Sequence, residues 1–164
     1  MNKGHIILLN GISSSGKTTI AKELFKKLPN YFHIGLDNFD NFIESMEDRK
    51  IKKLIPVETE YFFHRNIAMF SDEKVNLIVD HVLHDEFTKN NFFEVFSDYP
   101  VLYVGVYCPL EELIRREKLR GDRPKGLAEQ QYNFVHKGIN YDVEINTFYE
   151  SVEESVNKIL DKLS

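Results

Sequence analysis

The sequence is poor in the features that mark secreted and membrane proteins. It has no tryptophan and a single cysteine, Cys108, which cannot form an internal disulfide. Its longest apolar runs are about six residues, whereas a helix that spans a bilayer needs roughly 20. The N-terminus also lacks the charged and then apolar layout of a secretory signal. These absences predict a cytoplasmic protein without a membrane segment.

An excess of basic residues is missing as well. The chain of 164 residues has 21 Lys and Arg against 26 Asp and Glu, which gives a formal net charge of −5. This balance argues against a general binder of nucleic acid or membrane surfaces, so any basic site must be local. Hydrophobic residues make up 42% of the chain and aromatic residues 13%, which is enough apolar surface for a core. The length fits one domain, 1–164.

Apolar runs alternate with helical patterns along the chain. The runs that predict strands are Ile6–Leu9, Phe32–Leu36, Val75–Val79, Val101–Tyr107 and the shorter Tyr141–Ile145. The apolar spacing predicts helices at Lys17–Leu28, Leu110–Arg120 and Val152–Leu163. Such alternation is typical of βαβ units, so we expect an α/β fold around a buried parallel sheet.

The stretch "GISSSGKT", Gly11–Thr18, follows the first predicted strand and precedes the first predicted helix. It matches GxxxxGK[ST], a loop whose backbone N–H groups surround phosphate oxygens and in which glycines permit backbone angles closed to other residues. Lys17 would place its charge on the β- and γ-phosphates, and Thr18 would offer its hydroxyl to Mg²⁺. The expected phosphate-binding residues are Gly11, Ser13, Ser14, Ser15, Gly16, Lys17, Thr18 and Thr19.

Two aspartates end predicted strands at the carboxyl edge of the sheet, where α/β proteins bind ligands. Asp80, in "VNLIVDHVLHD", stands where a Walker B carboxylate would hold Mg²⁺ opposite Thr18. Asp37, in "FHIGLDNF", could accept the proton of an incoming hydroxyl. It could equally be the N-cap of a helix that begins at Asn38, and the spacing alone does not separate these readings.

The stretch "IRREKLRGDRPKG" is dense in arginine for an acidic protein. It indicates a lid, about 115–136, whose guanidinium groups close over phosphates. The arginines are Arg115, Arg116, Arg120 and Arg123. Arg120 and Arg123 flank the helix break and are favoured for catalysis, whereas Arg115 and Arg116 are expected to be solvated. The alternative is a set of exposed helical arginines paired with Glu111, Glu112 and Glu117.

Taken in order, "GISSSGKT", "FHIGLDNF", "LIVDHVLHD", "VGVYCPLEEL", "REKLRGDRPKGLAEQQ" and "VHKGINYDVEINT" resemble the chloramphenicol phosphotransferase-like family of P-loop kinases. The resemblance covers nearly the whole chain. It implies a three-layer P-loop kinase fold with a five-stranded parallel sheet and an arginine-bearing lid. It also implies ATP and Mg²⁺ as cofactors, a small-molecule hydroxyl as phosphoryl acceptor, Asp37 as base, and Arg120 and Arg123 as phosphate binders.

The segment 38–74 is expected to shape the acceptor pocket. It mixes aromatic and charged residues and is predicted to be helical in two pieces around Pro56, although surface helices that cover the sheet edge would give the same pattern. It is more compact than its counterpart in the founding resistance enzyme of the family, so chloramphenicol itself is not predicted as the acceptor. The sequence names neither the acceptor nor the oligomeric state, and it does not separate ATP from GTP.

Two other functions remain open from the sequence. One is a kinase that acts on a nucleoside, nucleotide or nucleotide sugar. The other is a nucleotide-dependent switch. Guanine-binding switches usually have an Asn-Lys-x-Asp segment, and "TKNN", Thr88–Asn91, does not match it, which argues against a switch.

Several polar residues in the recognised segments have no predicted chemistry. His81 and His84 lack metal-ligand partners at a convincing spacing. His136 and Tyr141 are expected to pack the lid against the sheet, and Cys108 is expected to be a buried small hydrophobe.

Overall fold

The computed structural model describes residues 2–122 and 124–163. The strands are β1 (Ile6–Gly11), β2 (Tyr31–Gly35), β3 (Asn76–His81), β4 (Val101–Tyr107) and β5 (Val143–Asn146). The helices are α1 (Lys17–Lys27), α2 (Leu36–Met46), α3 (Thr59–Asp72), α4 (Glu86–Val95), α5 (Leu110–Arg120), α6 (Leu127–Tyr132) and α7 (Val152–Leu163). None of these helices is long and apolar enough to cross a membrane.

The strands form one parallel sheet in the order β2-β3-β1-β4-β5. β1 lies in the middle and is buried along its whole length, because its apolar side chains alternate between two covered faces. The predicted α/β fold with a five-stranded parallel sheet is therefore confirmed. β5 begins at Val143, two residues later than predicted, because Tyr141 lies before the strand and hydrogen-bonds to Asn10.

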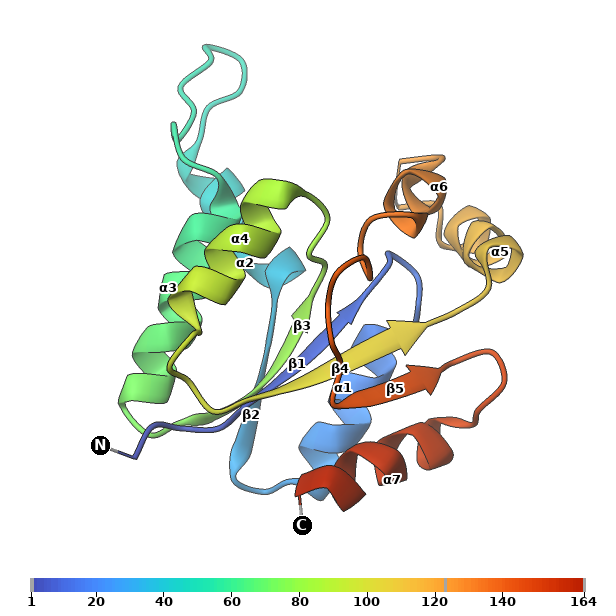
Figure 1. Ribbon diagram of the computed structural model, residues 1–164. Coiled ribbons are helices and arrows are strands. Elements are labelled where there is room, and N and C mark those ends of the chain that lie inside the picture. Colours follow the sequence, from blue (N-terminus) through green and yellow to red (C-terminus); the bar gives the residue numbers. More distant parts are fainter. Residues whose placement is uncertain (1, 123, 164) are drawn as a thin grey trace.

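Helices cover both faces of the sheet in three layers (Figure 1). On one face α1 and α7 pack through Ile20, Leu24 and Ile159. On the other face α3 and α4 pack through Phe63 and Phe92. The carboxyl ends of the strands thus lie at one edge, where β1 runs into the P-loop and β2 and β3 run into the segments with Asp37 and His81. The fold brings these segments together around one opening.

The segment 38–74 is helical in two pieces, as predicted, but the break is wide. α2 ends at Met46 and α3 begins at Thr59, and the chain between them protrudes from the body of the molecule (Figure 1). α3 is a core helix, because Phe63 and Ile67 are fully buried. α2 is more exposed, and only Ile43 on it is buried.

The α4 and α6 helices were not assigned from the sequence. α4 carried a local signal, since Asp85 caps it by accepting a hydrogen bond from the Thr88 N–H at 2.7 Å. α6 has only six residues and packs on α5. α5 and α6 lie side by side beyond the carboxyl end of β4, and they contain most of the segment 115–136 that the sequence predicts as a lid (Figure 1).

Candidate active site

The P-loop joins β1 to α1, and its backbone faces a cavity of about 810 Å³. Gly16 has φ 96°, a left-handed conformation that favours glycine, and it precedes α1 without any side-chain cap. The N–H groups of the first helical turn therefore face the cavity without a capping side chain. Such groups, together with the helix dipole, suit an anion.

The role expected of Gly11 was wrong in its physical reason. Gly11 does not have a positive φ, whereas Ser14 has φ 67°. Gly11 is needed because a Cβ there would lie 2.5 Å from the Val106 carbonyl oxygen on β4. It therefore lets the loop lie close against the neighbouring strand.

Lys17 and the loop serines line the same cavity. Lys17 is 7% exposed, and its Nζ donates a hydrogen bond to the Ile12 carbonyl at 2.9 Å. The Ser14 hydroxyl is buried and has no hydrogen-bond partner within the described residues. A buried cation and an unpartnered buried hydroxyl beside the loop N–H groups fit a phosphate chain.

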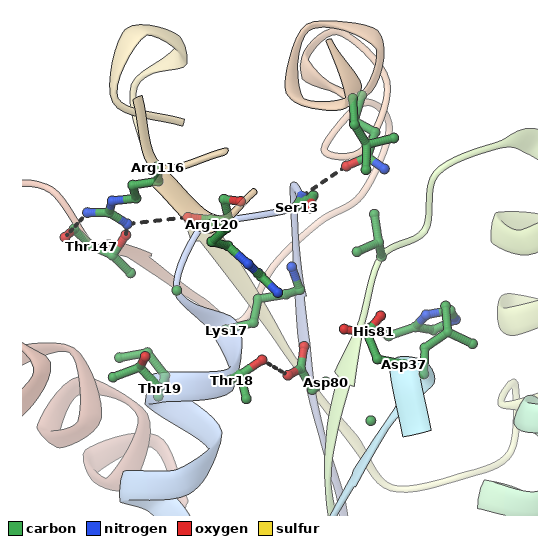
Figure 2. A pocket seen from close by; sticks show the side chains of 18 of the residues that line it. Ser13, Lys17, Thr18, Thr19, Asp37, Asp80, His81, Arg116, Arg120 and Thr147 are labelled. Atoms are coloured by element: carbon green, nitrogen blue, oxygen red, sulfur yellow. Dashed lines mark hydrogen bonds between the residues drawn. The ribbon is translucent and has the colours of Figure 1, made fainter. Parts of the chain in front are cut away.

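The Thr18 hydroxyl donates a hydrogen bond to the Asp80 carboxylate at 2.5 Å, as Figure 2 shows. Asp80 lies at the end of β3, next to β1, and His33 Nε2 lies 3.9 Å from the same carboxylate oxygen that accepts from Thr18. Burial lowers the pKa of His33, and the nearby Asp80 carboxylate opposes this shift. A hydroxyl and a carboxylate are oxygen ligands of the kind Mg²⁺ prefers, so the pair fits that ion. Within the described residues no group of three acidic, His or Cys side chains could hold a metal without the phosphates.

Asp37 lies in the first turn of α2, and its side chain lines the cavity across from the P-loop (Figure 2). The helix begins at Leu36 after Gly35, so the alternative of Asp37 as N-cap of a helix from Asn38 is wrong. Asp37 is therefore in the right cavity for the base that the sequence suggested.

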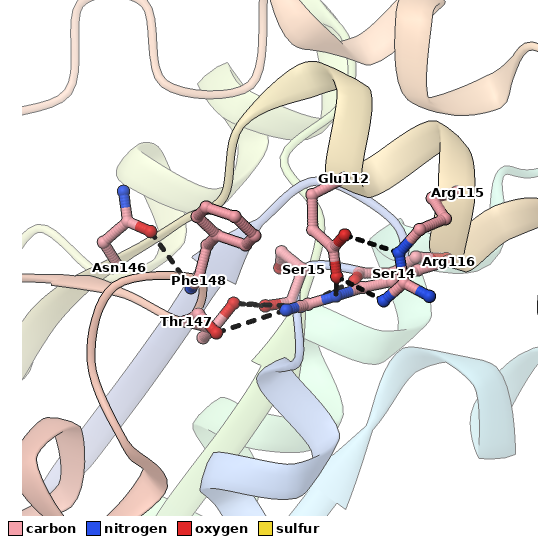
Figure 3. Close-up of polar contacts among 8 residues, drawn as sticks. All are labelled: Ser14, Ser15, Glu112, Arg115, Arg116, Asn146, Thr147 and Phe148. Atoms are coloured by element: carbon pink, nitrogen blue, oxygen red, sulfur yellow. Dashed lines mark hydrogen bonds and ion pairs between the residues drawn. The ribbon is translucent and has the colours of Figure 1, made fainter.

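Arg116 lies against the P-loop, which contradicts its expected solvation. It donates hydrogen bonds to Thr147 Oγ1 at 3.1 Å and to the Thr147 carbonyl at 3.2 Å. It also donates to the Ser14 carbonyl at 3.5 Å (Figure 3). Thr147 in turn donates to the Ser15 carbonyl at 2.6 Å. Arg116 is thus part of a brace around the loop. No spacing rule reveals this contact, because Ser14 and Arg116 are 102 residues apart.

Arg115 points outward, as expected, and shares Glu112 with Arg116 (Figure 3). The hydrogen bonds from Arg115 and then Arg116 lower the pKa of Glu112 to about 2. Arg120 lines the cavity and donates to Asp122 at 3.1 and 3.2 Å. Arg123 lies outside the described residues.

Two other residues of the predicted lid segment make contacts that the sequence did not reveal. Among the described residues, the buried Glu117 has no arginine partner and accepts hydrogen bonds from the N–H groups of Gly126 and Ala128, at 2.7 and 2.8 Å. Gln131 lines the cavity and accepts from the Ser13 N–H at 2.9 Å. Glu117 therefore fixes α6 on α5, and Gln131 ties α6 to the P-loop.

His136, in the segment predicted as a lid, packs on Tyr141 and on Tyr107 of the sheet, which agrees with the expected packing role. The Tyr141 hydroxyl lies 2.8 Å from His136 Nδ1 and accepts from Asn10 Nδ2 at 2.7 Å. Burial lowers the pKa of His136 to about 4 and raises that of Tyr141. Cys108 is a buried small hydrophobe whose thiol pKa is raised by burial.

The described geometry can be compared with known proteins. A family model for chloramphenicol phosphotransferase-like protein matches residues 4–164. The chain belongs to the chloramphenicol phosphotransferase-like family. One relative is "Putative O-phosphotransferase Rv2636" of Mycobacterium tuberculosis. It is 31% identical in an alignment that covers 97% of this chain and 82% of that protein.

A second relative of this phosphotransferase-like chain is cytidine diphosphoramidate kinase of Campylobacter jejuni, 24% identical over 99% of this chain and 98% of that protein. The solved structure of Mycobacterium tuberculosis APS kinase CysC superimposes with a TM-score of 0.72, at 18% identity and 99% coverage of both chains. That likeness shows the P-loop kinase fold. The family and its kinase relatives make this chain a small-molecule kinase.

Proposed function

We propose that the protein transfers the γ-phosphoryl group of Mg·ATP to a hydroxyl of a small molecule, with Asp37 as general base. One observation supports this most strongly: the Asp37 carboxylate lines the same cavity as Lys17 and the Thr18–Asp80 pair. A phosphate-binding half and a proton acceptor therefore share one cavity. Phosphoryl transfer needs little more than alignment and charge neutralisation.

In the proposed step Asp37 accepts the proton of the acceptor hydroxyl as its oxygen bonds to the γ-phosphorus. The bond from that phosphorus to the β,γ-bridging oxygen breaks, and ADP leaves with the bonding electron pair. Lys17 and Arg120 supply positive charge to the phosphates, and the P-loop N–H groups hold them in place. Bound Mg²⁺, held through Thr18 and Asp80, would neutralise further phosphate charge.

The lid has two tasks in this proposal. Through Arg116 and Gln131 it would fix the P-loop backbone, and the contacts to Ser14 and Ser13 support this role. Its cover over the cavity limits access of water, which would otherwise compete with the acceptor hydroxyl. Arg120, at the end of α5, would exchange Asp122 for phosphate when nucleotide is bound.

The test is a transfer screen with labelled γ-phosphate over alcohols, sugars, antibiotics and nucleosides, read by mass spectrometry. We expect a phosphorylated product with wild-type protein and ATP. Asp37→Asn should retain ATP affinity and lower transfer by at least about a hundredfold. Exposed Asp98→Asn is the matched control, because it makes the same chemical change away from the cavity.

Three results would count against the proposal. Equal transfer by wild type and Asp37→Asn would remove Asp37 from the base role. Faster turnover on nucleosides or nucleotides than on every other hydroxyl compound would move the protein to a nucleotide-type kinase. Nucleotide binding without transfer to any compound would indicate a switch.

A further inference from the structure

The cavity has a second half, beyond Asp80, formed by α2, α3 and the ends of β2 and β3. Within the described residues, the Lys and Arg side chains that line the cavity are Lys17, Arg116 and Arg120, and all three come from the P-loop and lid side. The second half is lined instead by carboxylates and imidazoles. Its titratable residues are Asp37, Asp40, Glu60, His33, His81 and His84.

Asp40 on α2 and Glu60 on α3 both line this half, close enough for the charge of Glu60 to act on Asp40. Burial, and then the charge of Glu60, raise the pKa of Asp40 to about 6. The charged partner that approaches Glu60 within the described residues is His84, at 3.8 Å, and it is charged only when protonated. Neither acid has a Lys or Arg ion-pair partner in the described part of the chain. A bound cation would therefore relieve the repulsion between them.

His81 adds an independent feature that points to a ligand. It lines the cavity, is 1% exposed, and its Nδ1 atom has no hydrogen-bond partner within the described residues. The amide oxygen of Asn91 can only accept, so His64 Nδ1, at 2.8 Å, carries a proton. Burial lowers the pKa of His64 to about 4, so its Nε2 accepts from His81 Nε2, also at 2.8 Å.

These two hydrogen bonds fix the tautomer of His81. Its proton lies on Nε2, and its Nδ1 presents an unshared electron pair. This half of the cavity thus offers two carboxylates and a buried hydrogen-bond acceptor. A buried acceptor without a donor costs free energy, so the site favours a ligand rich in N–H and O–H groups.

We propose that the phosphoryl acceptor is a hydroxyl compound that carries a cationic amino group, which Asp40 and Glu60 bind while His81 Nδ1 accepts a hydrogen bond from a second donor group. The inference rests on the proposed function only in treating this ligand as the acceptor. It disfavours acceptors with a carboxylate or phosphate next to the reacting hydroxyl, because these would meet the acids without a compensating cation.

Binding tests this without any need for turnover. Calorimetric titrations would use wild-type protein with Mg²⁺ and a non-hydrolysable ATP analogue, against amino sugars and aminoglycosides. Each probe is paired with its N-acetylated form, which keeps the hydroxyls and loses the charge. We expect at least one amino compound to bind at least tenfold tighter than its N-acetylated partner. If no amino compound binds, or if the acetylated forms bind equally well, the inference is overturned.

Isosteric variants locate the effect. Asp40→Asn and Glu60→Gln should each weaken binding of the amino compound about tenfold and leave ATP-analogue affinity within twofold. Glu73 is an exposed residue that follows α3. The substitution Glu73→Gln is the matched control and should change neither affinity. Unchanged amino-compound affinity in both cavity variants would refute the assignment of the two acids.

The two proposals can fail separately. If a neutral or acidic hydroxyl compound is phosphorylated in an Asp37-dependent manner and amino compounds are ignored, the kinase proposal stands and the cationic acceptor falls. If an amino compound binds with the expected preference but is never phosphorylated, the ligand preference stands and the transfer proposal falls.

Discussion

The two halves of the cavity are built from opposite materials. The half that we propose for the phosphates, here called the phosphate half, uses main-chain N–H groups and cations. Most of these groups come from one stretch, Gly11–Thr18. The half that we propose for the acceptor, here called the acceptor half, uses carboxylates and imidazoles from α2, α3 and β3. The difference teaches that the phosphate half is built from residues close together in sequence, whereas the acceptor half depends on how separate helices pack. Substitutions should therefore separate nucleotide effects from acceptor effects.

The largest effect is expected from the buried cation of the phosphate half. Lys17→Ala removes the charge nearest the P-loop backbone and should lower turnover by at least about a hundredfold. Steady-state phosphotransfer kinetics would measure it. Lys27→Ala, at the exposed end of the same helix, is the control. Turnover within threefold of wild type would show that the loop does not hold the reacting phosphates.

The next effect concerns the metal side of the same half. Thr18→Val keeps the shape of the side chain but removes the hydroxyl that contacts Asp80. The Mg²⁺ concentration that gives half-maximal rate should rise between about tenfold and a hundredfold. Titration of Mg²⁺ at saturating ATP measures this. An unchanged Mg²⁺ dependence would place the metal elsewhere.

Arg116 and Arg115 form a matched pair, because both bind Glu112 but only Arg116 reaches the P-loop. Arg116→Ala should raise the KM for ATP about tenfold, since charged hydrogen bonds contribute about 1.5–3 kcal/mol. Arg115→Ala should leave it within twofold. Equal effects of the two variants would mean that the brace around Thr147 is not needed for nucleotide binding.

The smallest effect sharpens the acceptor half. The pKa of Asp40 is raised in the folded protein, so the folded state binds more protons than the unfolded state between about pH 4 and 6. Stability through this group is therefore lost as pH rises through that window. Asp40→Asn should raise the free energy of unfolding at pH 8 by about 1 kcal/mol or less, because solvent screens a half-buried group.

Urea denaturation at pH 8 and pH 5 would check this prediction. The gain from Asp40→Asn should shrink at pH 5, where the wild-type carboxyl is mostly protonated. A gain of the same size at both pH values would mean that the charge of Asp40 is not what destabilises the folded protein.

Much of the phosphate half could be predicted before the structure. The β1 strand, the P-loop and α1 are contiguous, so their residue types and spacing carry the geometry. Asp80 could be placed beside Thr18 because apolar strands in a parallel sheet end at one edge. The same rule placed Asp37 at this edge, although the structure puts it in the first turn of α2 rather than before a helix.

The arginines and the acceptor half could not be predicted in the same way. Arg115 and Arg116 are neighbours in sequence, and only the rotation of α5 against β4 and the P-loop decides which one faces inward. Asp40 and Glu60 come from two helices whose relative packing sets their distance. The state of His81 depends on His64 and Asn91, which lie on two different helices, α3 and α4.

The sequence by itself determined the parallel α/β sheet and the phosphate-binding loop. Both follow from short-range patterns, and the loop binds through main-chain groups whose positions depend on glycines and on the start of a helix. Only the tertiary structure decided which arginine braces that loop and which acids meet across the cavity. Those choices depend on helix packing, which brings together side chains that no local spacing relates.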